Sequence, residues 1–570
     1  MANGITIRGC EFKNLTPSTN PQDNGIGIFS INAGFNLIPY CTSNDILCPE
    51  ENLVKNTFNN LNYGVWAGLS TLPINIDQCE FENNYCGILA FHAQNVNITN
   101  NDINVGTIGL LLNRSNAYKV QENTFSSDKN IINYGIVVME SGPHPNLIYK
   151  NTFENKLSIP CHSEGENCGP WNTAPVDVPE SLYLGAGLVF KCNDYAGEKQ
   201  LCDIEITSGG IAANQGFCYD VNTPAGNIFN TGPTLPQGNI AIGSHVSSPF
   251  TYYYHDAADA IPDIYSSSNI DITTHNCDIS TSSCPGYFSG SNPSGLISTI
   301  NNYSTLLISK VAPIIYGNTQ SLLNKVINAN TTTGLTFAQL TNELIAVSPY
   351  VSDTVLIASI NKYDTLEPEM LKEVMTANSP LTNKVRAVLD TKALPDSIIQ
   401  AIGSVQSGIS ARADLEAQIT DTMMWIGFAE NELVRQYIND TSISGLDSVI
   451  SYFTTRMDDL SRKALVEAYF TKNDSTNMIS ALDSLTLYNY SDTLYKDFYT
   501  LMSDYCTNKK LLTEMDSVEE QIIRGIAASN TEASAPAQAV LALVFNEIPG
   551  IELEKLDIPD SMSIHGYLYC

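Results

Sequence analysis

Basic residues are scarce in this chain of 570 residues. It has 28 Lys and Arg against 60 Asp and Glu, so its formal net charge is −32 at pH 7. Binding to nucleic acid depends on neutralising phosphates with Lys and Arg, and a strongly acidic protein repels such a polyanion. The shortage therefore excludes nucleic acid as a partner, and it disfavours an anionic membrane surface.

Long hydrophobic runs are also missing. No segment approaches the roughly 20 consecutive apolar residues that a helix needs to cross a bilayer. Residues 1–7 (MANGITI) lack the basic segment followed by an apolar stretch that marks a signal peptide. We therefore expect no membrane span, and we expect any export leader to lie upstream of this sequence.

Cysteines, in contrast, are frequent. The 14 cysteines include four pairs with six residues between the two members: Cys41/Cys48, Cys79/Cys86, Cys161/Cys168 and Cys277/Cys284. Equal spacing predicts disulfide clips and an oxidising compartment. Zinc or free thiols are the alternative, although no C-x2-C spacing and no neighbouring His accompany the pairs. The sequence leaves open how Cys10, Cys192, Cys202, Cys218, Cys506 and Cys570 are paired.

A short motif recurs near the start of the chain, with 22 or 23 residues between its first four copies. The copies are NTF at 56–58, CEF at 79–81, NDI at 101–103, and NTF at 123–125 and again at 151–153. Each of the first four is followed by a glycine that opens a short apolar strand. Such a period, with Asn-rich and Gly-rich turns, predicts a right-handed parallel β-helix. The recurring asparagines are expected to point inward, bond to one another and play a structural role.

The pattern predicts two domains. Residues 1–293 are expected to form the β-helix, with disulfide-clipped insertions, and a Pro-rich segment at 159–179 interrupts the register. From residue 294 to 570, apolar residues recur every three or four positions behind Asp, Ser and Pro, which predicts an α-helical module of repeated helical hairpins.

Several of these features together resemble large secreted right-handed β-helix proteins of Bacteroidetes type, whose function is uncharacterised. The resemblance rests on the Asn-x-Phe coils, on GIAANQG at 210–216 followed by PAGNIF at 224–229, and on SPYVSD at 348–353. It implies export as type IX secretion cargo, with a leader at one end and a sorting domain at the other. We accordingly expect the chain to be a fragment of a longer secreted or cell-surface protein.

Three ionisable residues fall five positions after the strand glycine in consecutive coils. They are His92, Arg114 and Glu140. Because neighbouring strands lie about 4.8 Å apart, we expect these side chains to be neighbours. An arginine holds a carboxylate while a histidine or glutamate moves a proton, so the row is the candidate catalytic constellation. The alternative is a charge ladder that only stabilises strand ends.

The outward positions of the same strands are apolar and include Trp66, Phe91 and Met139. A solvent-facing row is normally polar, so we expect this face to be covered. Either the helical half packs on it, or it lines a groove in which these three residues bind a glycan, with aromatic rings stacking on sugar rings.

Carboxylate clusters of the kind that glycan lyases and hydrolases use are not evident, because the repeated slots hold Asn and Thr. No cofactor is predicted, and Ca²⁺ is the one metal that stays a candidate, although the sequence shows no clear site for it. The sequence therefore predicts an extracellular structural or adhesive repeat protein that binds a glycan or a protein partner. The alternatives are a polysaccharide lyase or glycoside hydrolase acting on the β-helix face, and a protein-binding helical scaffold with an apolar groove near residues 425–437.

Overall fold

The computed structural model divides into two compact units. It describes residues 2–547 apart from gaps at 19, 21–22, 32, 44–47, 71, 130, 155, 169–186, 198–200, 219–222, 230–234, 269, 271, 283, 285–291, 365, 408–409, 440–444, 457–458, 488–489, 530 and 546. Unit 1 comprises Met1–Cys168, Gly187–Ile297 and Gly427–Cys570, and unit 2 comprises Gly169–Ala186 and Ser298–Ile426. Strands give way to helices between Asn276 and Pro293. The units do not follow the predicted boundary at 293, because the helices after Gly427 belong with the strands.

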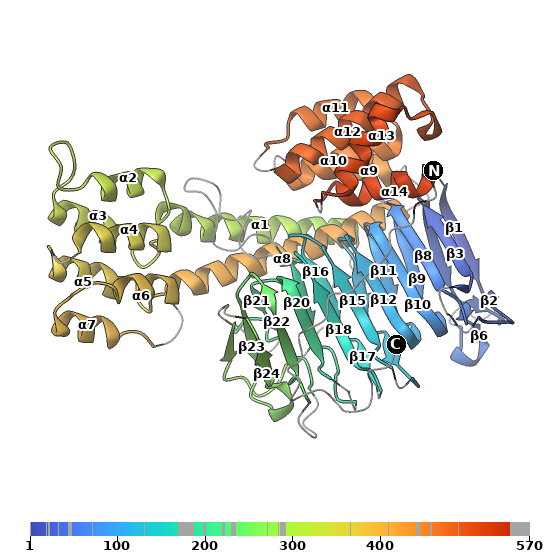
Figure 1. Cartoon of the computed structure of the whole chain (residues 1–570), viewed down its shortest axis with the longest axis horizontal. Helices are drawn as coiled ribbons and strands as arrows, with labels where there is room; N and C mark the ends of the chain where they lie inside the picture. The colour runs from blue at the N-terminus through green and yellow to red at the C-terminus, as the bar shows by residue number, and fades with distance from the viewer. Residues whose placement is uncertain are drawn as a thin grey trace. The chain divides into compact units, whose positions relative to one another are not determined.

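Unit 1 contains the parallel β-helix that the repeat predicts (Figure 1). Sheet A orders β1 (Ala2–Arg8), β4 (Ala33–Ile38), β9 (Ile74–Asp77), β11 (Val96–Thr99), β13 (Lys119–Gln121), β16 (Asn146–Tyr149) and β19 (Leu188–Lys191). Sheet B orders β2 (Glu11–Lys13), β7 (Thr57–Asn59), β10 (Glu80–Ala93), β12 (Asp102–Asn113), β15 (Tyr134–Met139), β18 (Ile159–Glu164), β20 (Ile204–Gly209), β22 (Ile240–Val246) and β24 (Ile264–Ser266).

Shorter strands complete the coils. Sheet B also contains β3 (Ile26–Ile31), β8 (Tyr63–Ser70), β14 (Thr124–Ser126) and β17 (Thr152–Phe153), which pair with one another or with β10 and β12. A third sheet orders β21 (Asn214–Gln215), β23 (Phe250–Tyr254) and β25 (Ile272–Asn276). The antiparallel pair β5 (Tyr40–Cys41) and β6 (Leu53–Val54) forms in the insertion that holds the Cys41–Cys48 disulfide.

A ladder of buried asparagines runs along one corner of the β-helix, which confirms the predicted structural role. In each step, the backbone N–H and the side-chain amide of one asparagine donate to the Oδ1 atom of the next. The steps join Asn101, Asn123, Asn151, Asn193 and Asn227, with donor–acceptor distances between 2.9 and 3.2 Å. The ladder satisfies backbone donors that would otherwise be buried at the turns without a partner.

The interior is filled by stacked aromatic rings. Phe58 stacks on Phe81 at 4.8 Å between ring centroids, and Phe125, Phe153 and Tyr195 continue the same kind of stack. The strand glycines leave room for these rings. A Cβ atom at Gly109 would lie 2.6 Å from the carbonyl oxygen of Gly135, so the coils pack too closely there for any side chain.

Unit 1 also contains a helical part with its own apolar core. Its helices are the end of α8 (Ala411–Asn439), α9 (Gly445–Thr454), α10 (Asp459–Lys472), α11 (Ser475–Asp483), α12 (Tyr490–Asn508), α13 (Ser517–Ala527) and α14 (Ser534–Phe545). Helix α13 begins with a capping box in which Asp516 and Glu519 bond to each other's backbone N–H groups.

Unit 2 is helical and repetitive. Its helices are α1 (Pro293–Tyr316, from Ser298 on), α2 (Gln320–Asn328), α3 (Phe337–Val347), α4 (Asp353–Tyr363), α5 (Pro368–Ala377), α6 (Asn383–Leu389), α7 (Asp396–Gly403) and the first part of α8. Helices two places apart pack together, α2 on α4, α3 on α5, α4 on α6 and α5 on α7. Such stacking is typical of helical repeats. None of the described helices is both long and apolar enough to cross a membrane.

Candidate functional site

The outer face of sheet B carries two rows of side chains, because alternate residues of a strand point away from the interior. The strand register aligns one row through Phe29, Trp66, Leu89, Leu111, Val137, His162 and Glu205. It aligns the second through Phe91, Asn113, Met139 and Glu164. This outer face is therefore aromatic and apolar in the early coils and polar in the later ones.

The apolar part of this face is covered by protein. Trp66 and Phe91 are only 1% and 4% exposed, and they share a cluster with Ala539 of α14, which contacts β8 and β10. Met139 is half-buried beside them. The prediction that Trp66 and Phe91 stack on a sugar does not fit their burial. The alternative, that the helical half packs on this face, does.

The predicted row of His92, Arg114 and Glu140 lies at one corner of successive coils, and all three residues adopt positive φ angles between 44° and 53°. Burial lowers the pKa of His92 to about 4, against the opposing charge of Glu532. Burial also raises the pKa of Glu140, and the Arg114 charge opposes that shift. The charges of neighbouring members thus act on one another, and the Glu532 carboxylate from the helical part acts on His92, the first member of the row.

The next coil continues this corner with Gly165 and not with Cys192. The backbone N–H of Glu140 donates to the carbonyl oxygen of Glu164, and a Cβ atom at Gly165 would meet the Glu140 carboxylate. Cys192 lies at another corner, next to Asn193 of the asparagine ladder, and is bonded to Cys284. The Pro-rich segment that begins at residue 159 breaks the repeat in the sequence, so the sequence does not show that Gly165 is the next residue at this corner.

The helical part of unit 1 contributes to a polar cluster that consists of the buried Glu467, the half-buried Lys463 and Glu532, and the half-buried Gln94 of the β-helix. Lys463 lies 2.6 Å from Glu532 and 3.1 Å from Asp492, and the Gln94 amide donates to Glu467. Burial and the Glu532 charge raise the pKa of Glu467 to about 7. Burial also acts on Glu532, but the Lys463 charge outweighs it and lowers the pKa of that carboxyl. Side chains of the helices are thus bonded to the β-helix beside His92.

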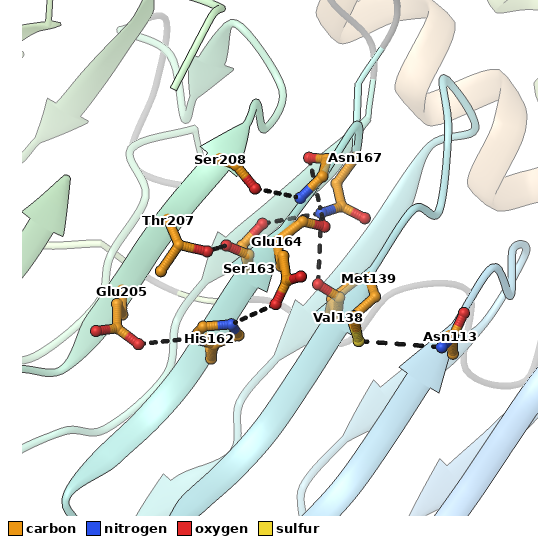
Figure 2. Close-up of polar contacts among 11 residues, drawn as sticks. Asn113, Val138, Met139, His162, Ser163, Glu164, Asn167, Glu205, Thr207 and Ser208 are labelled. Carbon is orange, nitrogen blue, oxygen red and sulfur yellow. Dashed lines mark hydrogen bonds and ion pairs between the residues drawn. The ribbon is translucent and has the colours of Figure 1, made fainter. Parts of the chain in front are cut away.

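The polar part of the outer face holds a second constellation, the carboxylate–imidazole bridge of Glu205, His162 and Glu164 (Figure 2). His162 Nδ1 lies 2.6 Å from Glu205 Oε2, and Nε2 lies 3.4 Å from Glu164 Oε2. His162 is fully buried, and its ring meets Tyr134 edge-on at 5.3 Å. Sequence reasoning missed this bridge, because the 159–179 segment was read as an interruption and not as strand β18.

The bridge holds a charge in place. Burial disfavours an imidazolium, but the hydrogen bonds and charges of Glu164 and Glu205 outweigh it and raise the pKa of His162 to about 9. At neutral pH the ring is therefore protonated and both nitrogens are engaged. A histidine in this state neither accepts a proton nor offers a lone pair, so the bridge links β18 to β20 and is unsuited to general-base work.

The cysteines pair differently from the prediction at most positions. Cys41 is bonded to Cys48 as expected, but Cys277 is bonded to Cys218, and Cys284 to Cys192. Cys79, Cys86, Cys161, Cys168 and Cys202 are buried and do not belong to these three disulfides. Cys79 lies in the interior whereas Cys86 lies on the covered outer face, so the pair points to opposite sides of sheet B. Burial raises the pKa of the Cys79 and Cys168 thiols to about 12.

The aromatic residue that marks the predicted helical groove, Trp425, is half-buried in unit 2. It stacks on Tyr303 with 6.2 Å between ring centroids. Tyr437, in unit 1, packs partly buried against the helical core of that unit. Both rings are thus packed against neighbours within their own units.

Residues 2–178 match the protein family described as "Periplasmic copper-binding protein (NosD)". The match covers the early coils of the β-helix, in agreement with the parallel sheets. Neither curated proteins nor solved structures give a match. The donor groups do not fit copper, since the described residues contain no group of three or more His, Cys, Asp or Glu side chains arranged to hold a metal ion. What this chain shares with that family is thus its β-helix repeat.

Proposed function

We propose that the protein is an exported repeat protein of the periplasm or cell surface, with a structural or adhesive role towards a glycan or protein partner. One observation carries the proposal. Helix α14 packs on the aromatic outer face of sheet B and buries Trp66 and Phe91. The surface that a sugar-cleaving enzyme would need as a groove is filled by the protein's own helix.

Three further observations support export. The matched family is described as periplasmic. The disulfides Cys192–Cys284 and Cys218–Cys277 are of the kind that persists in oxidising compartments. The formal charge of −32 favours solubility. Export as type IX cargo, which the resemblance to secreted β-helix proteins implies, forms part of the proposal.

The outer face of sheet A is the surface that fits an adhesive role. Asn36, Asn75 and Asn97 are in register on three neighbouring strands and are half-exposed. Asn75 donates its side-chain amide to Asn36 Oδ1 at 2.6 Å. Each amide carries donors and acceptors, and the row repeats at about the strand spacing of 4.8 Å. A neutral polyhydroxylated chain is the partner that such a row suits.

A glycan array with the purified full chain tests this proposal. We expect binding without release of reducing or unsaturated sugar ends. The double variant Asn75→Ala/Asn97→Ala should lose the binding, and Ser126→Ala on β14, a half-exposed polar residue of the other sheet, should keep it. Sugar release that Glu164→Gln abolishes would replace the proposal by a hydrolase or lyase. Fractionation of the producing cell should place the protein in the periplasm or at the surface.

A protein-binding helical scaffold is the second candidate, because α1 exposes large apolar side chains in unit 2. Ile308 and Tyr316 are 74% and 66% exposed, and both lie on one face of the helix. If the helices bind a partner protein, Ile308→Asp/Tyr316→Asp should weaken that complex and leave glycan binding unchanged. The reverse pattern would favour the adhesive face of sheet A.

A further inference from the structure

We infer that residues 2–178 of this chain do not take up copper, although they match a family described as copper-binding. The side chains that could ligate the metal there are bonded to other groups, lie beside a fixed positive charge, are buried as protonated thiols, or stand alone. The inference concerns this chain's donors, and it goes beyond the structural or adhesive role proposed above.

Copper in proteins is held by thiolate, thioether and imidazole ligands. In the matched span these types are three histidines, seven cysteines and Met139, and all lie in the part of the chain that the structure describes. The histidines are His92, His144 and His162, and the cysteines are Cys10, Cys41, Cys48, Cys79, Cys86, Cys161 and Cys168.

His162 has no lone pair to offer. Its two ring nitrogens are hydrogen-bonded to the carboxylates of Glu205 and Glu164, and the protonated ring is fully buried. A copper ion would have to displace a proton from a ring that two carboxylates hold in the charged form. Coulomb attraction within a buried site opposes that exchange.

His92 and His144 are closer to what a metal needs, because burial lowers the pKa of both rings and keeps them neutral. The Glu532 charge acts on both rings. Of the candidate ligands in the span, these two imidazoles together with the Glu532 carboxylate most resemble a set of metal ligands. However, Glu532 is paired with the Lys463 ammonium at 2.6 Å. That fixed positive charge occupies the carboxylate and repels a metal cation.

The sulfur atoms are also poorly suited to bind copper. Cys41 and Cys48 form a disulfide. Cys79, Cys86, Cys161 and Cys168 are buried, and burial raises the pKa of the Cys79, Cys86 and Cys168 thiols, so these hold their protons. Cys10 is exposed but stands alone at the first coil. Met139 accepts a weak contact from the Asn113 amide at 4.0 Å. A single thiol or thioether does not make a tight copper site.

The test is a metal titration of the intact full chain with its disulfides formed. Cu(II), and Cu(I) without oxygen, are added in the presence of a chromophoric chelator, and copper content is measured after gel filtration. We expect the native chain to leave the copper with the chelator. The reduced chain in urea serves as the positive control, because its exposed thiols should take the metal.

Variants assign any uptake that occurs. Stoichiometric uptake that is lost in His92→Gln, His144→Gln or His162→Gln, or that brings a copper–thiolate absorption band, overturns the inference. Uptake that survives these three substitutions and Met139→Leu, and that brings no such band, does not involve the candidate ligands of residues 2–178 and agrees with the inference. Absence of uptake by the unmodified chain supports the inference without any variant, and a variant's loss of uptake counts only where its circular dichroism matches that of the unmodified chain.

Discussion

Asn123 donates its side-chain amide to Asn151 Oδ1 at 3.0 Å, and its backbone N–H reaches the same oxygen at 3.1 Å. Its own Oδ1 atom accepts the equivalent pair of bonds from Asn101. One side chain thus satisfies donors of two coils at a buried turn. Each step of the ladder fixes the distance between coils as well as the turn itself.

Asn123→Ala should destabilise the protein by about 2–4 kcal/mol, because two buried donors of Asn101 would lose their acceptor. The midpoint of urea unfolding, followed by far-UV circular dichroism, measures the loss. Ser126→Ala, three residues later on the same coil and half-exposed, should change stability by less than about 0.5 kcal/mol. Equal midpoints for Asn123→Ala and the unmodified protein would mean that the ladder carries no stability.

The ladder also shows why the fold could be predicted from the sequence. Only one side chain per coil can fill the turn slot, so Asn56, Asn101, Asn123 and Asn151 repeat with the coil. Beyond Asn151 the next members are Asn193 and Asn227, at intervals of 42 and 34 residues. Loops of different length separate the later coils, so these coils do not recur at a fixed interval in the sequence. Contacts in space, and not spacing in sequence, define that part of the solenoid.

Gly109→Ala should be strongly destabilising although alanine adds only one carbon atom. Its Cβ would lie 2.6 Å from the Gly135 carbonyl oxygen and 3.0 Å from Phe125, so the coils would have to separate. We expect a loss of about 2–3 kcal/mol. Gly525→Ala is the matched control, because nothing lies within 4 Å of that position in α13. There the better helix propensity of alanine should add up to about 1 kcal/mol. The opposite order of stability would contradict the packing described.

Glu467 should make stability fall as the pH rises. Burial and the Glu532 charge raise its pKa from 4.5 to about 7 in the folded protein, so the folded state holds a proton that the unfolded state has lost. The associated stability is complete below pH 4.5 and is lost as the pH rises through about 7. The glutamine of Glu467→Gln stays neutral at every pH. The melting temperature of this variant minus that of the unmodified protein should therefore become larger as the pH rises from 4.5 to about 7.

The comparison isolates Glu467 because the other titrating groups of the cluster, Glu532, Lys463, Asp492, His92 and His144, are present in both proteins. Glu122→Gln, which alters an exposed carboxyl on the β-helix, is the control and should show a constant difference. A difference between Glu467→Gln and the unmodified protein that does not change from pH 5 to pH 8 would mean that Glu467 is not held protonated.

The candidate sites could be predicted only in part, for a physical reason. Stacking places His92, Arg114 and Glu140 in one row, because equal offsets from a glycine become neighbours in parallel coils. Whether such a row is open depends on what packs over it, and Glu532 lies 440 residues from His92 in the sequence. The pairing of Cys277 and Cys284 likewise depends on partners in earlier coils. Neither the packing over the row nor the disulfide pairing can be recognised from the residues next to these positions in the sequence.

Peptide mapping without reduction should find the links Cys41–Cys48, Cys192–Cys284 and Cys218–Cys277. The last two close long loops. In the simplest treatment, each raises the free energy of the unfolded state by about 4 kcal/mol because it lowers the entropy of the unfolded chain. A thiol reagent should label Cys10 in the native protein and reach Cys79, Cys86, Cys161, Cys168 and Cys202 only in denaturant, because these are buried. A Cys79–Cys86 link would refute the assignment of these residues to opposite sides of sheet B.

Cys79 occupies a slot of the asparagine ladder, and replacing it by asparagine should stabilise the protein. Cys79 donates its backbone N–H to Asn101 Oδ1 at 2.9 Å, as an asparagine would, but it offers Asn56 only a sulfur atom at 3.9 Å. Cys79→Asn supplies the missing oxygen, and a good buried hydrogen bond contributes about 1 kcal/mol. Cys86→Asn, on the covered apolar face, should instead lose stability because its amide would find no partner. Thermal unfolding of the two variants measures both effects. If Cys79→Asn melts below the unmodified protein, the slot is too small for the amide, and cysteine is there for its volume.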